Sequence, residues 1–549
     1  MKYYPMQMHL HTCHQPGGSM EGHIYNAKRL GMEYIRFTDH DTRIGPKNHP
    51  LSRFDFSKGE LSYKEVGGRL GFQTVGDGNA FCEDNSIRYT FAPEGGERRE
   101  GGLYYFSDGN SHTVSLIGDI TLCLDVSFRL YGDARAVIDI RLSQRPPDHS
   151  AAHFRYVLGA PGECSEPHTV EYKLPEPVDG VYRLHLSEDI GKCRELGGLD
   201  NVFDTATILI EANDGGGEFV LREFEIKRKY GYDELIKRQR IVADEIGARY
   251  GVKPFVTTEI SGAGQHKNVF STAVPVIDYA ERGFQITEME AIAHVKRHGG
   301  IFAYNHPFEN NKYKKLTLTD EEIKRAVEDD AASLIASRAL GASMMEVAFI
   351  EGRGQFGLRE YLRLWDLMGL GGVFITGYGD SDSHKNHLSW FEGQNACSWI
   401  AADENIPFPI AEEHFIASMK AGRVYAGDPV YLTYPISFFS GSTEMGGIIP
   451  VPDGDYDERR FTFTASAPEP GSEIRAVVDG MTVISEIVEG GEYRLEFSVK
   501  PERCVSLARI ELYNPRGRCI LITNPIYLVR TAEYPLELPG ERLYGEFRK

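Results

Sequence analysis

The chain has 549 residues, 60 basic and 80 acidic, which give a formal charge of −20. This length exceeds one ordinary hydrophobic core and predicts two to four domains. The negative charge argues against a nucleic-acid partner, and no apolar run is long enough to span a bilayer, so we expect no membrane partner either. Met1–Pro5 lacks the apolar core of a signal peptide, and the eight cysteines form no CxxC pair. We therefore expect a cytoplasmic protein.

The predicted secondary structure changes after residue 53, from an α/β pattern to a pattern of strands. Residues 1–53 begin as strand, loop, helix and strand, with the helix over Gly22–Leu30, a pattern typical of an α/β domain. Over 54–228, strand-like alternation as in Thr121–Leu130 and Glu218–Ile226 is separated by glycine-rich turns. This predicts an inserted β-sandwich of the jelly-roll type. Carbohydrate binding and a structural role both stay open for it.

Helical periodicity returns at Tyr232–Tyr250, and helices and strands then alternate over 229–428. From 429 to 549 the pattern is all-β and predicts a C-terminal β-sandwich. The expected fold is therefore an α/β domain in two parts, 1–53 and 229–428. It is interrupted by the inserted domain 54–228 and followed by the domain 429–549.

Six apolar segments end in histidines or carboxylates. They are Met6–His11, Tyr34–His40, Pro254–Ile260, Ile301–His306, Met344–Ala348 and Val373–His384. Short apolar runs indicate buried strands, and side chains at the ends of successive strands converge at the mouth of a barrel. Imidazoles and carboxylates are ligands for zinc, manganese and iron. The pattern predicts a metal site.

Each of these segments is a weak signal alone, and the prediction rests on the six together. His9 and His11 flank Leu10, so both imidazoles point to one face of a strand. Glu259 follows a mostly apolar strand, where a carboxylate requires a partner or a cation.

The motifs HLH, FTDHD, TTEIS, GQHKNVF, GGIFAYNHP and GDSDSH, in this order, resemble those of the PHP (polymerase and histidinol phosphatase) superfamily. The resemblance covers the split α/β domain. The Ala421–Arg423 stretch and Thr523–Tyr527 resemble, more loosely, a subgroup that includes carbaryl-hydrolase-like enzymes. The resemblance implies a distorted, TIM-like (β/α)7 barrel that holds two or three divalent ions of manganese, iron or zinc.

Carried over by position, the resemblance also implies a ligand set. One ion would be held by His9, His11, Glu259 and Asp382, and a second by Glu259, His266 and His306. His40 and His384 would hold a third. The loop after His11 departs from the pattern of the superfamily, and His14 is its candidate ligand for the third ion.

A hydroxide that bridges two such ions is a nucleophile at neutral pH. Asp382, His40 and His384 are the candidates for orienting it or for protonating the leaving group. The expected activity is hydrolysis of a small-molecule phosphate ester, with a substrate that is phosphorylated or carbohydrate-linked. A carboxylic ester, carbamate or amide hydrolase is the alternative, and a non-catalytic protein that binds through its β-domains is the alternative of another class.

Two more residues keep two interpretations each. Arg423 is a candidate for binding a substrate anion through its fork of donors, or forms a surface ion pair. Glu346 ends a buried strand and either lines the substrate pocket or accepts a structural hydrogen bond.

Overall fold

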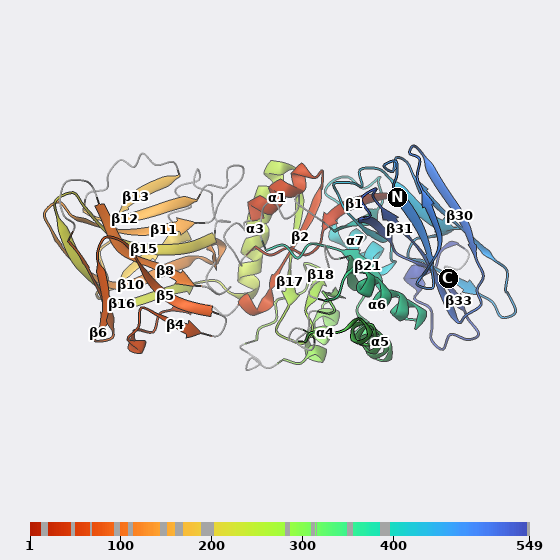
Figure 1. Cartoon of the computed structure of the whole chain (residues 1–549), viewed down its shortest axis with the longest axis horizontal. Coiled ribbons are helices and arrows are strands. Elements are labelled where there is room, and N and C mark those ends of the chain that lie inside the picture. Colours follow the sequence, from red (N-terminus) through yellow and green to blue (C-terminus); the bar gives the residue numbers. More distant parts are fainter. Residues whose placement is uncertain are drawn as a thin grey trace.

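The computed structural model describes residues 1–545 apart from 13–19, 45–49, 66–67, 93–98, 108–113, 143–150, 160–167, 188–201, 280–285, 309–312, 314–315, 349–354 and 385–395. The described residues are mostly β-strand and include six α-helices. Figure 1 shows the inserted strands at one end of the long axis, the helices in the middle and the C-terminal strands at the other end. None of the described helices is long and apolar enough to cross a membrane.

Nine strands of the middle part form one continuous row. Their order is β21 (Thr376–Gly379), β20 (Met344–Ala348), β19 (Ile301–Tyr304), β18 (Lys267–Phe270), β17 (Lys253–Ile260), β2 (Tyr34–His40), β1 (Lys2–Gln7), β22 (Cys397–Ala402) and β23 (Val424–Gly427). Strand β21 packs against β23, and a parallel bridge joins Leu10 to Ser383, beyond the ends of β1 and β21. The row therefore curves back on itself, and the segments that follow β1 and β21 meet.

This row differs from the expected (β/α)7 barrel. Strands β1, β2 and β17 are parallel neighbours, as are β19, β20 and β21. Strand β18, however, runs antiparallel to both β17 and β19. Only residues 261–266 connect β17 to β18, and a parallel pair would need a crossover of about a dozen residues. The short connection therefore imposes a hairpin where regular alternation would place a helix.

The helices start where sequence signals place them. They are α1 (Met20–Arg29), α3 (Tyr232–Tyr250), α4 (Glu288–Arg297), α5 (Asp320–Ala336), α6 (Leu358–Leu370) and α7 (Glu412–Lys420). Capping boxes open α4 at Thr287 and α5 at Thr319, because each threonine hydroxyl accepts from a backbone N–H three residues on. The predicted helix over Tyr232–Tyr250 is α3.

The inserted part consists of two sheets around one apolar core. One sheet contains β3 (Pro50–Arg53), β6 (Asn79–Glu83), β7 (Ser86–Phe91), β10 (Ile120–Tyr131), β14 (Tyr182–His185) and β16 (Gly216–Arg228). The other contains β4 (Ser62–Glu65), β5 (Gly68–Gly76), β8 (Arg99–Ser107), β9 (Val114–Ser115), β11 (Arg135–Leu142), β12 (Ala152–Leu158), β13 (Thr169–Lys173) and β15 (Val202–Ala212). The alternating segments quoted from the sequence lie in β10 and β16, and their inward residues are buried.

The C-terminal strands also form two layers around a shared core. One layer is β24 (Ile436–Ser440), β25 (Thr443–Glu444), β27 (Arg459–Ala465) and β30 (Tyr493–Val499). The other is β26 (Ile448–Val451), β28 (Glu473–Val478), β29 (Met481–Ile487), β31 (Val505–Tyr513), β32 (Cys519–Thr523) and β33 (Ile526–Arg530). This second layer continues the central row, because β23 pairs with β32. The expected boundary at 428/429 therefore does not separate two sheets.

Asn524 fastens the C-terminal strands to the central row. Its side-chain Oδ1 accepts from the backbone N–H of Gly377 at 2.8 Å. Its Nδ2 donates to the carbonyls of Gly377 at 2.7 Å and Val424 at 2.6 Å. The asparagine thus provides hydrogen-bond partners for backbone groups of both β21 and β23. These bonds lie close in sequence to the segment that carries Asp382.

We expect Asn524→Ala to lower the free energy of unfolding by about 3 kcal/mol, because it leaves buried backbone groups without partners. Thermal denaturation measures the effect, and Asn405→Ala in an exposed loop is the matched control. A loss no larger than that of the control would show that Asn524 does not hold the two parts together.

Candidate metal centre

The segment after β1 places two imidazoles side by side. Strand β1 ends at Gln7, and Leu10, which lies between His9 and His11, forms the parallel bridge to Ser383. The His11 N–H donates to the Ser383 carbonyl at 3.0 Å, which ties this segment to the one after β21. Both imidazoles are fully buried, and their Nε2 atoms lie 3.1 Å apart.

Glu259 lies at the centre of the histidines. It is the penultimate residue of β17 and stands opposite His40 of β2 in the parallel pair. Its Oε1 lies 3.4 Å from His9 Nε2, 3.2 Å from His266 Nδ1 and 3.5 Å from His306 Nε2. Its Oε2 contacts His40 Nδ1. One fully buried carboxylate therefore faces four imidazoles from four segments of the chain.

Asp382 joins the second half of the cluster. Its Oδ1 lies 2.8 Å from His11 Nε2, 3.2 Å from His9 Nε2 and 3.8 Å from His384 Nδ1. Asp382 and His306 both have positive φ angles, 45° and 27°, which non-glycine residues rarely adopt. Such strained backbone persists where the surroundings hold a side chain in a set position, and it concentrates at functional sites.

Three groups of side chains can each present three ligand atoms within 4.8 Å of one another. They are His9, His11 and Asp382; His40, Glu259 and His266; and His11, His40 and His384. The first contains three of the four ligands implied for one ion, without Glu259, and the third contains His40 and His384 together with His11. In the second, His40 takes the place expected for His306, whose Nε2 still lies against Glu259.

The charges of these side chains suit cation binding. Burial acts to raise the pKa of Glu259, but His9 and the other imidazoles outweigh it and hold the pKa well below its usual range. Burial, with His40 and His384 nearby, holds the pKa of His11 well below its usual range. Burial acts to lower the pKa of His9, but Asp382 and Glu259 raise it well above its usual range. A carboxylate that stays ionised and an imidazole that stays neutral are both donors for a divalent metal, and the raised pKa of His9 shows that the carboxylates around it attract a positive charge.

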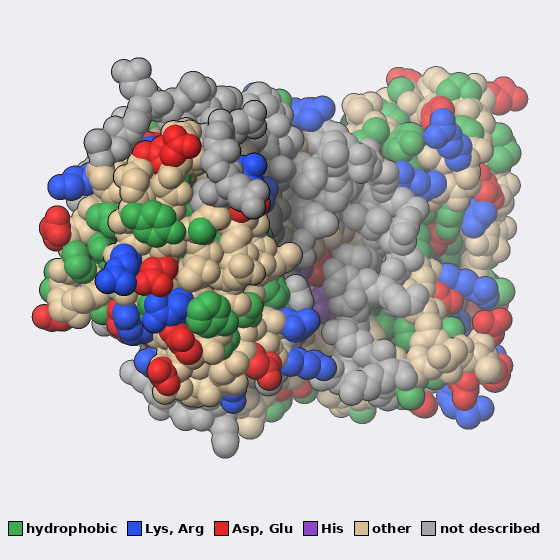
Figure 2. Space-filling view, turned by 60° about the vertical axis from the view of Figure 1, so that its left-hand side comes forward, with side chains coloured by type: hydrophobic (Ala, Val, Ile, Leu, Met, Phe, Trp, Pro, Cys, Tyr) green, Lys and Arg blue, Asp and Glu red, His purple; other side chains and the backbone are tan. Residues whose placement is uncertain are grey.

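The cluster is closed on one side and open on the other. His9, His11 and Glu259 are inaccessible to solvent, whereas the side chains of His40, His266 and His384 are 15%, 35% and 29% exposed. Figure 2 shows histidine at the bottom of a recess on the face that it presents. Solvent therefore reaches the cluster from the side of these three histidines.

Other side chains hold the ligands in place. Asn305 donates to Glu259 Oε1 at 2.7 Å, and the Ser261 hydroxyl donates to Oε2 at 3.1 Å. Asp39 accepts from the backbone and the hydroxyl of Thr12, both at 2.6 Å, which anchors the end of the segment that carries His11. Sequence reasoning did not single out Asn305 or Ser261, although both adjoin a predicted ligand or its motif.

Asp380 was also missed. It is fully buried, and it forms with His9 and Glu346 a fourth group whose ligand atoms lie within 4.8 Å. The position of Asp380 in the same GDSDSH motif as the predicted ligands Asp382 and His384 was the available signal.

The remaining predicted residues have different outcomes. His14 lies outside the described residues. Glu346 is fully buried and accepts from the His306 N–H at 2.6 Å. This contact corresponds to the second of its two interpretations, a structural hydrogen bond to backbone.

Arg423 lies away from the cluster. It precedes β23, its Nη1 is 3.4 Å from Met1 Sδ, and its guanidinium lies 6.0 Å from the ring centre of Tyr544. Met1 adjoins the start of β1, whereas His9 follows its end. Arg423 is therefore not placed to bind a substrate at the cluster, and among the described residues it forms no ion pair.

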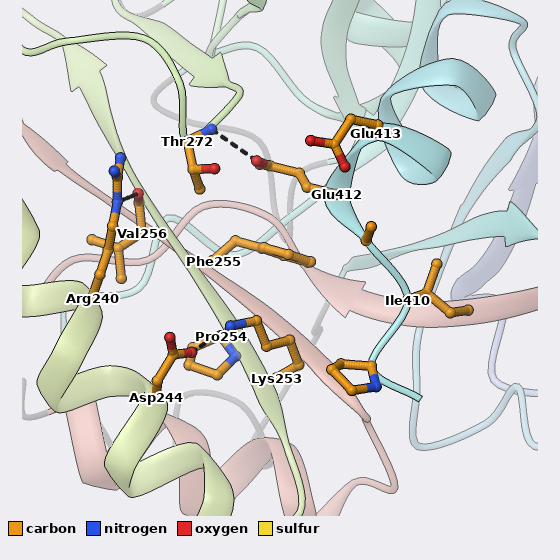
Figure 3. A pocket seen from close by; sticks show the side chains of 12 residues that line it. Arg240, Asp244, Lys253, Pro254, Phe255, Val256, Thr272, Ile410, Glu412 and Glu413 are labelled. Atoms are coloured by element: carbon orange, nitrogen blue, oxygen red, sulfur yellow. Dashed lines mark hydrogen bonds and ion pairs between the residues drawn. The ribbon is translucent and has the colours of Figure 1, made fainter. Parts of the chain in front are cut away.

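A separate cavity of about 310 Å³ lies at the other end of β17. In Figure 3, Arg240 and Asp244 of α3 face Glu412 at the start of α7 across Phe255. Asp244 is paired with Lys253 at 2.5 Å, and Glu412 accepts from the Thr272 N–H at 2.8 Å. Arg240, Asp244 and Glu412 thus each bond to neighbouring protein atoms, and the described residues that line this cavity include no cluster of histidines and carboxylates like the one around Glu259.

No family model matches the chain, and no curated protein matches it. Among solved structures, it is similar to a two-domain protein from Bacteroides vulgatus that contains a predicted PHP-like metal-dependent phosphoesterase. The identity is 14% over 52% of this chain and 79% of that one, with a TM-score of 0.27. It is also similar to a family 12 xyloglucanase from Bacillus licheniformis, with 9% identity over 33% of this chain and 97% of that one and a TM-score of 0.22. At TM-scores this low, neither likeness identifies the fold or the activity of this chain.

Proposed function

We propose that this protein is a metal-dependent hydrolase of the PHP type that acts on a small-molecule phosphate ester. The observation that carries the proposal is the convergence of six imidazoles and two carboxylates at one end of a curved sheet. These are His9, His11, His40, Glu259, His266, His306, Asp382 and His384. These residues belong to the motifs that resemble those of the PHP superfamily, and the motifs follow one another in the same order.

The residues present fit divalent cations. Glu259 is fully buried, and its ion-pair partners among the described residues are all histidines, so it has no lysine or arginine to compensate its charge. We assign one ion to His9, His11 and Asp382 and another to Glu259 with His40, His266 and His306. The third group, with His11, His40 and His384, is the candidate for a further ion. Bound ions would act as Lewis acids and would lower the pKa of a coordinated water.

The side chains divide into holding and reacting groups. His9, His11 and Glu259 are inaccessible, so they bind and do not exchange protons with solvent. His40 and His384 lie on the open side, and whichever of the two rings holds no ion is positioned there to protonate a leaving group. The Ser261 hydroxyl is 2.6 Å from His40 Nδ1 and orients that ring. Asp382, which adjoins both halves of the cluster, is the candidate for orienting the attacking water.

The finer architecture belongs to the same proposal. We assign the barrel to 1–53 and 229–428, as a PHP-type barrel with one hairpin, and the β-domains to 54–228 and 429–549. The β-domains are the candidates for recognising the rest of the substrate, including a carbohydrate portion.

Hydrolysis of three chromogenic esters tests the proposal. We expect p-nitrophenyl phosphate or bis-p-nitrophenyl phosphate to be hydrolysed in the presence of Mn²⁺ and not after treatment with a chelator. Hydrolysis of p-nitrophenyl acetate alone would replace the phosphoesterase by a carboxylic ester hydrolase. Failure to hydrolyse any of them, with metal bound, would favour a binding protein.

A further inference from the structure

Asp380 is a buried charge to which the proposed reaction assigns no role. It follows β21 and is fully inaccessible, and the Tyr378 hydroxyl and the imidazole of His9 face its carboxyl group. Its ion-pair contact is with Nδ1 of His9, at 3.7 Å. A buried carboxylate costs several kcal/mol unless a partner compensates it, so this contact has to be explained.

The backbone on both sides of Asp380 is fixed to the segment that carries His9. The Ser381 N–H donates to Oε1 of Gln7 at 3.1 Å, and the His11 N–H donates to the Ser383 carbonyl at 3.0 Å. Gln7 in turn donates to the Ala396 carbonyl at 2.9 Å. These bonds bracket Asp380 in one segment and His9 in the other, so the carboxylate and the imidazole are held face to face.

The two nitrogens of His9 face different surroundings. Nε2 points into the cluster, 3.4 Å from Glu259 and 3.2 Å from Asp382, whereas Nδ1 points to Asp380. An imidazole binds a metal through the nitrogen that carries no proton, and a carboxylate behind the ring keeps the proton on the other nitrogen. Asp380 occupies the position of such a carboxylate.

We propose that Asp380 is a positioning residue that accepts the Nδ1–H of His9 and thereby presents Nε2 to a bound cation. The inference rests on the proposed metal centre and adds to it a residue that holds no ion itself. Glu346, the other carboxylate of this group, accepts the backbone N–H of His306. The carboxylates behind the cluster thus fix one ligand through its ring and another through its backbone.

The test compares the metal affinity of purified, metal-depleted variants, measured by titration with Mn²⁺ against a competing chelator. We expect Asp380→Ala to weaken binding roughly 10- to 100-fold, the usual effect of removing a carboxylate behind a ligating histidine. Asp380→Asn keeps an acceptor without the charge, and its Mn²⁺ affinity should lie between those of the wild type and Asp380→Ala. Ser381→Ala is the matched control, because Ser381 is buried in the same segment and holds Gln7 through its backbone.

Nitrogen NMR of the protein labelled in its histidines supplies a readout that a purely structural role would not change. We expect the metal-loaded wild type to show His9 protonated at Nδ1, and Asp380→Asn to show weaker hydrogen bonding of that proton. Mn²⁺ affinity of Asp380→Ala equal to that of Ser381→Ala would overturn the inference. If Asp380→Ala does not fold, equal affinities of Asp380→Asn and the wild type would do the same. Failure of the wild type itself to bind Mn²⁺ would instead overturn the metal centre.

Discussion

Simultaneous replacement of His9 and His11 by alanine is expected to abolish both metal retention and hydrolysis. The two imidazoles lie side by side, and one or both belong to two of the three ligand groups. Alanine offers no donor atom, and nothing else in the segment from Gln7 to His11 can replace two nitrogen ligands. Elemental analysis of the purified double variant, together with the phosphate ester assay, measures both losses.

The matched control removes two histidines elsewhere. His294 and His298 lie four residues apart at the end of α4, where their rings bond to the carbonyls of Pro275 and His294. The variant His294→Ala/His298→Ala should keep the metal content and the activity of the wild type. Full activity in the His9/His11 variant would show that the cluster around Glu259 is not the reaction centre.

The ligand cluster could be predicted from the sequence because its geometry follows from strand periodicity. His9 and His11 alternate with Leu10, and Glu259 and His40 each end a buried strand. Parallel neighbours bring such ends to one edge, and β2 and β17 are parallel with Glu259 opposite His40. Local pattern and a general rule of sheet topology were therefore sufficient for these residues.

The hairpin strand could not be predicted in the same way. Strand β18 has four residues, and its first two, Lys267 and Asn268, are polar yet fully buried. Lys267 is compensated by Glu288 and by the ring of Tyr304, which are contacts that only the folded chain provides. A short strand with buried polar residues carries no apolar alternation that would reveal it.

The structure places Arg423 away from the cluster because of the direction of its strand, which no local sequence pattern reveals. Strand β22 runs antiparallel to β1, and β23 runs antiparallel to β22, so β23 has the direction of β1. Arg423 comes before β23, at the end of the sheet where β1 begins. Residues that precede a strand and residues that follow one lie at opposite ends, and the resemblance of the Ala421–Arg423 stretch contains no information on this.

Glu259→Gln is expected to reduce hydrolysis by about 1,000-fold, on the scale of losing one essential electrostatic group, and to remove at least one metal ion per chain. Glutamine has the shape of glutamate; its amide oxygen can still accept from Asn305, and its NH2 can donate to the Ser261 hydroxyl, so the fold should persist. It lacks the negative charge that His9, His40, His266 and His306 face. The loss of activity and of metal in Glu259→Gln would therefore measure the contribution of the negative charge of Glu259, and not that of the packing around its side chain.

Glu346→Gln provides the comparison that makes this result specific. Glu346 is also a fully buried strand-end glutamate, but it accepts the His306 backbone N–H and lies behind the histidines. We expect its variant to keep its metal and to lose about 10-fold in activity, the lower end for a group behind a ligand, because glutamine can still accept the His306 N–H. Metal content by elemental analysis and kcat on the phosphate ester would be measured for both variants in parallel. Equal losses in the two would mean that Glu259 contributes as one buried carboxylate among several, and that it does not bridge the halves of the cluster.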